Sequence, residues 1–153
     1  MTIRIQTTKE RVIAECNIQT SFDLQAMRVR EERANDVYDD WVMDAENKDE
    51  IDLALEDICA DMAFALRTVI PAYETTDNDI IINVTSNDVD LEKASGAIRR
   101  ATLQHIKMAL LAWWYHFRAP ELSNTYGAKA ADSLNKLFSL CISHSGRTIG
   151  SYF

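Results

Sequence analysis

Hydrophobic positions recur at helical spacing through most of the second half of the chain. In segment 91–118 most of them return at steps of three or four residues, which places them along one side of an α-helix. Pro120 forbids continuation and biases Ala119 away from helical angles. The pattern predicts a long helix over about 89–119. The residues of this stripe are Ile98, Leu103, Ile106, Leu110, Trp113, Trp114 and Phe117.

Two further stripes predict a helix on either side of this segment. The first covers 51–70, with acids in its first turns and Pro71 at its end. The second covers 120–144, with Pro120 at the first helical position. The linkage between the last two helices allows only a sharp reversal, so they form an antiparallel hairpin in which Leu134 and Phe138 face the central stripe. The first stripe comprises Ile51, Leu55, Ile58, Met62, Leu66 and Val69.

Two segments alternate in polarity or are dense in β-branched residues, which predicts strands. Residues 2–6 form a short strand, and residues 79–85 form a second. A lone strand leaves its backbone groups unpaired, so we expect these two to pair with each other. Tyr73–Asp79 is predicted as an acidic turn.

The rest of the first half is less regular. A capping box formed by Thr7 and Glu10 predicts a helix over 8–17. The polar segment 17–23 is predicted to be irregular, a helix to follow over 24–44, and 45–50 to be a loop.

These elements predict a mostly α fold, a long-helix hairpin bundle with one or two short β-strands. With 153 residues, including only four Gly and two Pro, the chain is expected to form one helical domain over 1–146. An extended C-terminal tail follows at 147–153. No apolar run approaches 18 residues, so we expect neither a signal peptide nor a membrane span.

Charge is distributed unevenly along the chain. Residues 31–57 hold twelve acids and two bases, a net charge of −10, whereas residues 86–153 hold five acids and eight bases. Two interpretations of the acidic region stay open: a solvated helical face, or a surface that meets a basic partner or that DNA passes without sticking. No concentrated basic surface for general nucleic-acid binding is visible. The candidate acidic surface is Asp36, Asp39, Asp40 and Asp44.

The sequence contains no motif that indicates catalysis, a metal or a cofactor. The pair Ser133 and Lys136 matches S-x-x-K, but its companion motifs are absent. His105 and His116 lie about three turns apart on one helix, too far to share a metal. We therefore expect no enzymatic activity and no cofactor. The three cysteines are expected to be free thiols, because their number is odd and no CxxC pair occurs: Cys16, Cys59 and Cys141.

Aromatic residues mark two candidate interfaces. The run 113–117 is aromatic nearly all round a helix end, so it is either core or partly a subunit contact. The tail ends in two aromatics, which favours docking on the body or on a partner. The candidate interface residues are Trp113, Trp114, Tyr115, Phe117, Arg147, Tyr152 and Phe153.

The order of parts resembles the small, mostly helical head-to-tail connector (neck adaptor) proteins of tailed bacteriophages. The likeness covers about residues 51–153. It rests on 80–84 leading into 88–91, on Leu110-x-x-Trp113-Trp114-x-x-Phe117-x-x-Pro120, and on the hairpin helix through Phe138. The aromatic tail is similar too, although it departs from the family in carrying a single arginine, Arg147.

The resemblance implies a structural virion protein made in the host bacterial cytoplasm and located in the neck. Such a protein forms a homo-oligomeric ring of about a dozen copies between the portal protein and the tail. The ring continues the DNA channel without binding DNA specifically, and it docks the next neck or tail component. The residues leave a second class open: an adaptor module outside a virion that uses an acidic surface against a basic partner. An enzyme is the least favoured class.

Overall fold

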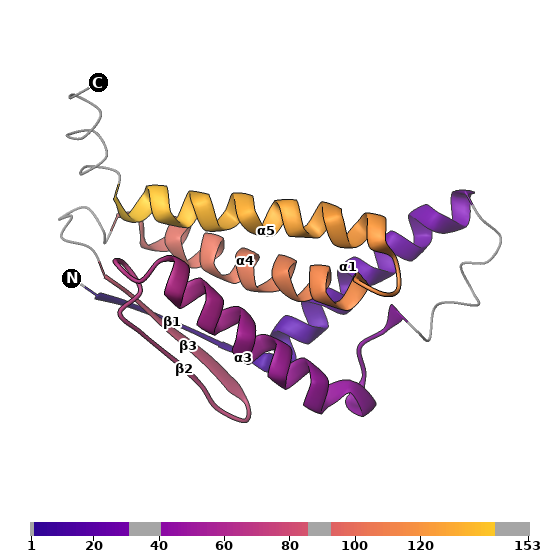
Figure 1. The fold of residues 1–153 in the computed structure, drawn as a ribbon, viewed down its shortest axis with the longest axis horizontal. Helices are drawn as coiled ribbons and strands as arrows, with labels where there is room; N and C mark the ends of the chain where they lie inside the picture. Colours follow the sequence, from indigo (N-terminus) through magenta and orange to yellow (C-terminus); the bar gives the residue numbers. More distant parts are fainter. Residues whose placement is uncertain (1, 31–40, 86–92, 143–153) are drawn as a thin grey trace, which may run out of the picture.

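The computed structural model describes residues 2–30, 41–85 and 93–142 of the chain. It is mostly helical with a small antiparallel sheet, so the mostly α class predicted from the sequence is confirmed. Helix α4 contacts α1, α3 and α5, and Figure 1 shows it between α5 and α3. The elements are β1 (Thr2–Thr8), α1 (Lys9–Arg30), η1 (Ala45–Asn47), α3 (Lys48–Ala65), β2 (Ala72–Thr75), β3 (Asp79–Thr85), α4 (Ser95–Tyr115) and α5 (Pro120–Cys141).

The strand predicted over 79–85 is β3, and it lies at the centre of the sheet. It pairs antiparallel with β1 from Thr2 opposite Thr85 to Thr8 opposite Asp79, which confirms the predicted pairing. Strand β1 runs two residues beyond the predicted segment 2–6. Because β3 has a neighbour on each edge, its backbone groups are paired on both sides.

A third strand, β2, occupies part of the segment predicted as a turn. Ala72–Thr75 pairs antiparallel with β3, so the prediction of a turn over 73–79 is wrong at its first residues. The turn is shorter: the Thr76 N–H donates to the Asp79 carbonyl at 2.9 Å, and the Asp79 N–H donates to Thr76 Oγ1 at 2.9 Å. Most of β2 is exposed, so no alternation of buried positions marks it in the sequence.

Helix α1 is continuous through the segment 17–23, which was predicted to be irregular. The side chains of its polar residues form hydrogen bonds that are compatible with a continuous helix. The Thr20 hydroxyl donates to the Cys16 carbonyl at 2.9 Å, one turn back. The Asn17 amide donates to the carbonyl of Met43 and accepts from its N–H, both at 2.9 Å. Asn17 therefore joins α1 to a distant segment.

The helix predicted over 24–44 does not reach residue 44. Asp44 has extended backbone angles and caps η1, whereas residues 24–30 are helical as predicted and belong to α1. Residues 31–40 lie outside the described part. The start of α1 is close to the prediction: Thr8 Oγ1 accepts from the Arg11 N–H at 3.1 Å, one residue later than the predicted capping box.

Both central helices end earlier than predicted. Helix α3 starts three residues before the predicted residue 51 but ends at Ala65 and not at residue 70. A turn follows, which keeps Leu66 and Val69 buried and leads the chain toward β2. Helix α4 starts at Ser95 and ends at Tyr115, whose carbonyl accepts from the N–H of Ala119 at 2.8 Å. Of its predicted range, 89–92 lie outside the described residues.

Helices α4 and α5 lie side by side and run in opposite directions (Figure 1). Pro120 occupies the first turn of α5 as predicted, and α5 extends to Cys141; residues 143–144 of the prediction are not described. The Ser123 hydroxyl donates to the Ala112 carbonyl at 2.7 Å, which ties the two helices near their connection. The inward position predicted for Phe138 is wrong, because Leu137 is fully buried and Phe138 is exposed.

Candidate functional site

The structure divides the predicted aromatic interface between core and surface. Trp114 and Tyr115 are buried in the chain's own core. The Trp114 indole N–H donates to the Trp41 carbonyl at 2.7 Å, and the rings of Trp41 and Tyr115 meet edge to face. Trp113 and Phe117 are exposed, Phe117 by 90%. Of these four candidate interface residues, Trp113 and Phe117 thus remain available to a partner.

The other predicted site residues fall mostly outside the described part of the chain. Asp44 is described and exposed, and its carboxylate accepts from the Glu46 N–H at 2.9 Å as the N-cap of η1. Its local role is therefore a cap. The residues outside the described ranges are Asp36, Asp39, Asp40, Arg147, Tyr152 and Phe153.

Helix α3 carries an outward surface that combines acids with exposed apolar side chains. Leu53 and Phe64 are 64% and 72% exposed. Positions 53, 57, 61 and 64 follow helical spacing, so they share one side of α3. Arg67 lies over the Phe64 ring at 4.9 Å from its centroid. We call the following residues the α3 acidic face: Glu50, Leu53, Glu56, Asp57, Asp61 and Phe64.

The acids of the α3 acidic face have no ion-pair partner among the described residues. The helical spacing of apolar residues predicts the buried stripe of α3, but it does not predict this exposed face. The available signal was Leu53 and Phe64, two large apolar residues that lie off the buried stripe.

A groove of about 410 Å³ lies between α4 and α5 and is also lined by Glu15 of α1. Three cations and one acid line it, and Glu15 already pairs with Arg11 at 3.5 Å. Leu103 supplies apolar surface. We call this the α4–α5 groove; its lining residues are Glu15, Arg100, Ala101, Leu103, Gln104, Lys107, Ser133 and Lys136.

The S-x-x-K pair Ser133 and Lys136 both line this groove. Within the described ranges, no hydrogen bond joins their side chains. The groove therefore offers cations and hydrogen-bonding groups to an anionic partner.

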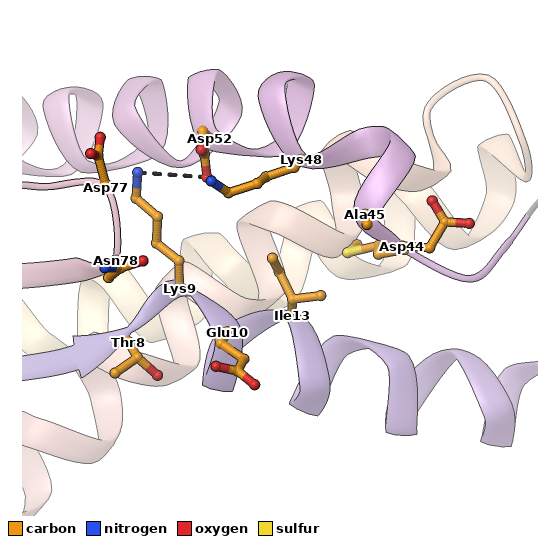
Figure 2. A pocket seen from close by; sticks show the side chains of 11 residues that line it. Thr8, Lys9, Glu10, Ile13, Asp44, Ala45, Lys48, Asp52, Asp77 and Asn78 are labelled. Atoms are coloured by element: carbon orange, nitrogen blue, oxygen red, sulfur yellow. Dashed lines mark ion pairs between the residues drawn. The ribbon is translucent and has the colours of Figure 1, made fainter.

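A second cleft, of about 520 Å³, surrounds the start of α1 (Figure 2). The Lys9 ammonium is buried and lies 3.6 Å from an oxygen of Asp52 on α3. The Lys9 backbone N–H also donates to the Asn78 carbonyl at 2.8 Å. Asp77 and Lys48 point into the same cleft (Figure 2). Because Lys9 is fixed at both ends, we interpret this cleft as a structural junction between β1, α1, α3 and the β2–β3 turn.

A shared carboxylate joins three helices farther along α1. Asp23 accepts hydrogen bonds from the hydroxyls of Tyr115 and Tyr126, each at 2.8 Å to Oδ2, and from the Gln19 amide at 3.3 Å to Oδ1. The rings of Tyr115 and Tyr126 stack at 5.7 Å. Burial, followed by the Asp23 carboxylate, raises the pKa of the Tyr126 hydroxyl, so both tyrosines are held as neutral donors.

The three cysteines and the partly buried His105 have structural environments. All three cysteines are free and buried, as predicted, and burial raises the pKa of the Cys16 thiol to about 12. His105 Nδ1 lies 2.8 Å from the Ala130 carbonyl, so the neutral ring donates a hydrogen bond from α4 to α5. Burial lowers the pKa of His105. The cysteines are packed in the core and His105 joins two helices, which leaves the exposed faces of α3 and α4–α5 as the strongest candidates for function.

Within the described ranges, no helix is long and apolar enough to cross a bilayer, and no three His, Cys, Asp or Glu side chains are grouped so that they could hold a metal ion. The candidate site is therefore a pair of unlike surfaces, one acidic and one basic. In comparisons with known proteins, the chain matches no protein-family model, no curated protein and no solved structure.

Proposed function

We propose that this protein is a structural subunit that associates head to tail with copies of itself into a closed ring. In the setting that the resemblance implies, the ring belongs to the neck of a tailed-phage virion and lies between the portal protein and the tail. It continues the DNA channel and docks the next component.

The observation that carries this proposal is the separation of charge onto different elements. Helix α3 holds six acids and one lysine, whereas residues 93–142 hold seven bases and two acids. Each copy thus offers two unlike surfaces with complementary potentials. Joining unlike surfaces gives a heterologous contact, and such contacts generate a ring when the rotation between copies closes.

The architecture fits a ring subunit in a second respect. We infer that α4 and α5 act as one long-helix hairpin at the heart of a bundle, held together by contacts along their length. Trp113 and Phe117 are exposed near the turn of this hairpin. Exposed aromatics are frequent anchors in protein interfaces, so this end is the proposed docking point for the portal or the next ring.

The proposed relation to DNA follows from charge. The chain has a formal net charge of −8, and DNA phosphates are repelled by a negative wall. A channel built from such subunits lets DNA pass without specific binding.

The exposed acids of the α3 acidic face also support a second candidate, an adaptor outside a virion that binds a basic partner. Such a module stays monomeric or dimeric by itself. Its partner binding weakens steeply with salt, because screening removes much of an exposed electrostatic attraction.

Light scattering of the purified full chain over a wide concentration range tests the proposal. We expect a closed species whose mass stays constant once formed, and ring-shaped particles in negative-stain electron microscopy. A chain that remains monomeric at every concentration contradicts self-assembly and favours the adaptor. A mass that keeps growing with concentration contradicts a closed ring and indicates an open filament.

A further inference from the structure

We propose that the contact between neighbouring copies is made by the α3 acidic face of one copy inserted into the α4–α5 groove of the next. This inference rests on the proposed self-assembly and names the two surfaces that meet. The occupant of the groove is thus helix α3 of a second copy.

The charges of the two surfaces complement each other. Arg100, Lys107 and Lys136 line the groove and have no ion-pair partner within the described ranges. Asp57 and Asp61 lie one turn apart on the α3 acidic face and are likewise unpaired there. A row of acids at helical spacing matches cations distributed along a groove between two helices.

The apolar parts of the two surfaces complement each other as well. Leu53 projects from α3 beside the acids and is 64% exposed. Leu103 is partly buried in the groove. A helix that lays an exposed apolar residue onto a groove while its charges meet the rim is a recurring mode of recognition. Covering Leu53 gives the contact a hydrophobic centre in addition to its ionic rim.

The two surfaces are separate on one copy. The groove is lined by residues of α1, α4 and α5, and none of those lining residues comes from α3. A chain therefore presents both surfaces at once, and each copy has one neighbour on either side. This is the arrangement that a head-to-tail ring requires.

Reciprocal charge reversal tests the contact. One variant carries Asp57→Lys and Asp61→Lys, and a second carries Arg100→Glu and Lys136→Glu. All four native residues are exposed, so both variants are expected to fold. We expect each variant alone to lose assembly, with association weakened about 100-fold or more by like charges at the contact.

Complementation makes the test specific. An equimolar mixture of the two variants, or one chain carrying all four changes, places lysines opposite glutamates and is expected to restore the wild-type mass. The matched controls are Glu46→Lys with Glu74→Lys, and Arg4→Glu, which alter exposed charges outside both surfaces and should assemble normally. Far-ultraviolet circular dichroism and thermal unfolding establish that each variant is folded.

The possible outcomes distinguish a failure of this contact from a failure of the proposed function. If both reversal variants assemble as the wild type does, the named contact is wrong while self-assembly stands. If folded variants lose assembly but neither the mixture nor the four-fold variant recovers it, the pairing of these two surfaces is wrong. If the wild type never assembles, the proposed function fails, and the contact with it.

Discussion

Tyr126 of α5 donates its hydroxyl hydrogen to the carboxylate of Asp23 at 2.8 Å, although the two residues are 103 positions apart in the chain. The same carboxylate accepts from Tyr115 of α4. One acidic side chain in the middle of α1 thus binds α1 to both α4 and α5. A polar residue at this position does not interrupt the helix, because its carboxylate accepts hydrogen bonds from side chains of α4, α5 and α1 itself.

Removing the Asp23 carboxylate should destabilise the protein. In Asp23→Ala, two partly or fully buried hydroxyls lose their acceptor, which costs on the order of 2–4 kcal/mol in the free energy of unfolding. Asp23→Asn keeps one acceptor oxygen and should cost less. Urea unfolding of the two variants measures the difference. Equal stability of Asp23→Ala and the wild type contradicts the structural role.

Alkaline pH should lower stability through the same cluster. Burial raises the pKa of Tyr115 and of Tyr126 above the ordinary value of 10.0, so the unfolded chain releases these protons first. Their contribution is complete below about pH 10 and is lost as pH rises further. The buried thiols act in the same direction. The double variant Tyr115→Phe, Tyr126→Phe should show a smaller fall in stability between pH 9 and 11 than the wild type.

Two adjacent tryptophans should respond very differently to the same substitution. Trp114 is 1% exposed and its indole N–H donates to the Trp41 carbonyl, so Trp114→Phe loses a hydrogen bond and leaves a void. We expect a loss of about 2–4 kcal/mol in the free energy of unfolding. Trp113→Phe is the matched control and should change stability by less than about 0.5 kcal/mol. Thermal unfolding followed by circular dichroism checks both.

The ion pair of Lys9 and Asp52 should show strong non-additivity. Asp52→Asn leaves the buried Lys9 ammonium without its anionic partner and should cost about 3 kcal/mol. Lys9→Met removes the buried charge and keeps the side-chain volume, so it should cost less. The double variant should be more stable than Asp52→Asn alone, as a double-mutant cycle would measure. Additive effects would mean that the two side chains do not interact.

Acidic pH should weaken the contact between α4 and α5 through His105. Burial lowers its pKa in the folded protein, so the unfolded chain binds the proton first, below about pH 6.5. The contribution of the neutral ring is complete above that pH and is lost as the pH falls. His105→Asn should flatten the dependence of stability on pH between 7 and 5. An equally steep dependence in His105→Asn and in the wild type would contradict this role of His105.

Hydrophobic periodicity predicted the elements that bury a continuous face. The stripe of α3, the centre of α4 and strand β3 were visible in the sequence, because burial of one face leaves a period of 3.6 or 2 in the chain. Pro120 located the start of α5, because proline fits a first helical turn. The pairing of β1 with β3 followed from the need to satisfy two otherwise lone strands.

Hydrophobic periodicity did not predict the elements whose polar groups form hydrogen bonds with residues far away in the chain. Segment 17–23 appeared irregular because Asn17 and Asp23 favour turns locally, yet their partners Met43, Tyr115 and Tyr126 come from elsewhere in the chain. Strand β2 was missed because it is exposed and therefore carries no apolar alternation. In both cases hydrogen bonds formed only in the folded protein outweigh local preference.

The sequence by itself determined the helical class, the strand over 79–85 and the excess of acids over bases, because these depend on composition and on neighbours along the chain. Tertiary structure decided which aromatics are core and which are surface: Trp113 and Trp114 are adjacent in sequence, but helix geometry turns them about 100° apart. It also decided that Arg100 and Lys136, from two different helices, share one groove. Such surfaces arise from the packing of distant segments, which no local pattern records.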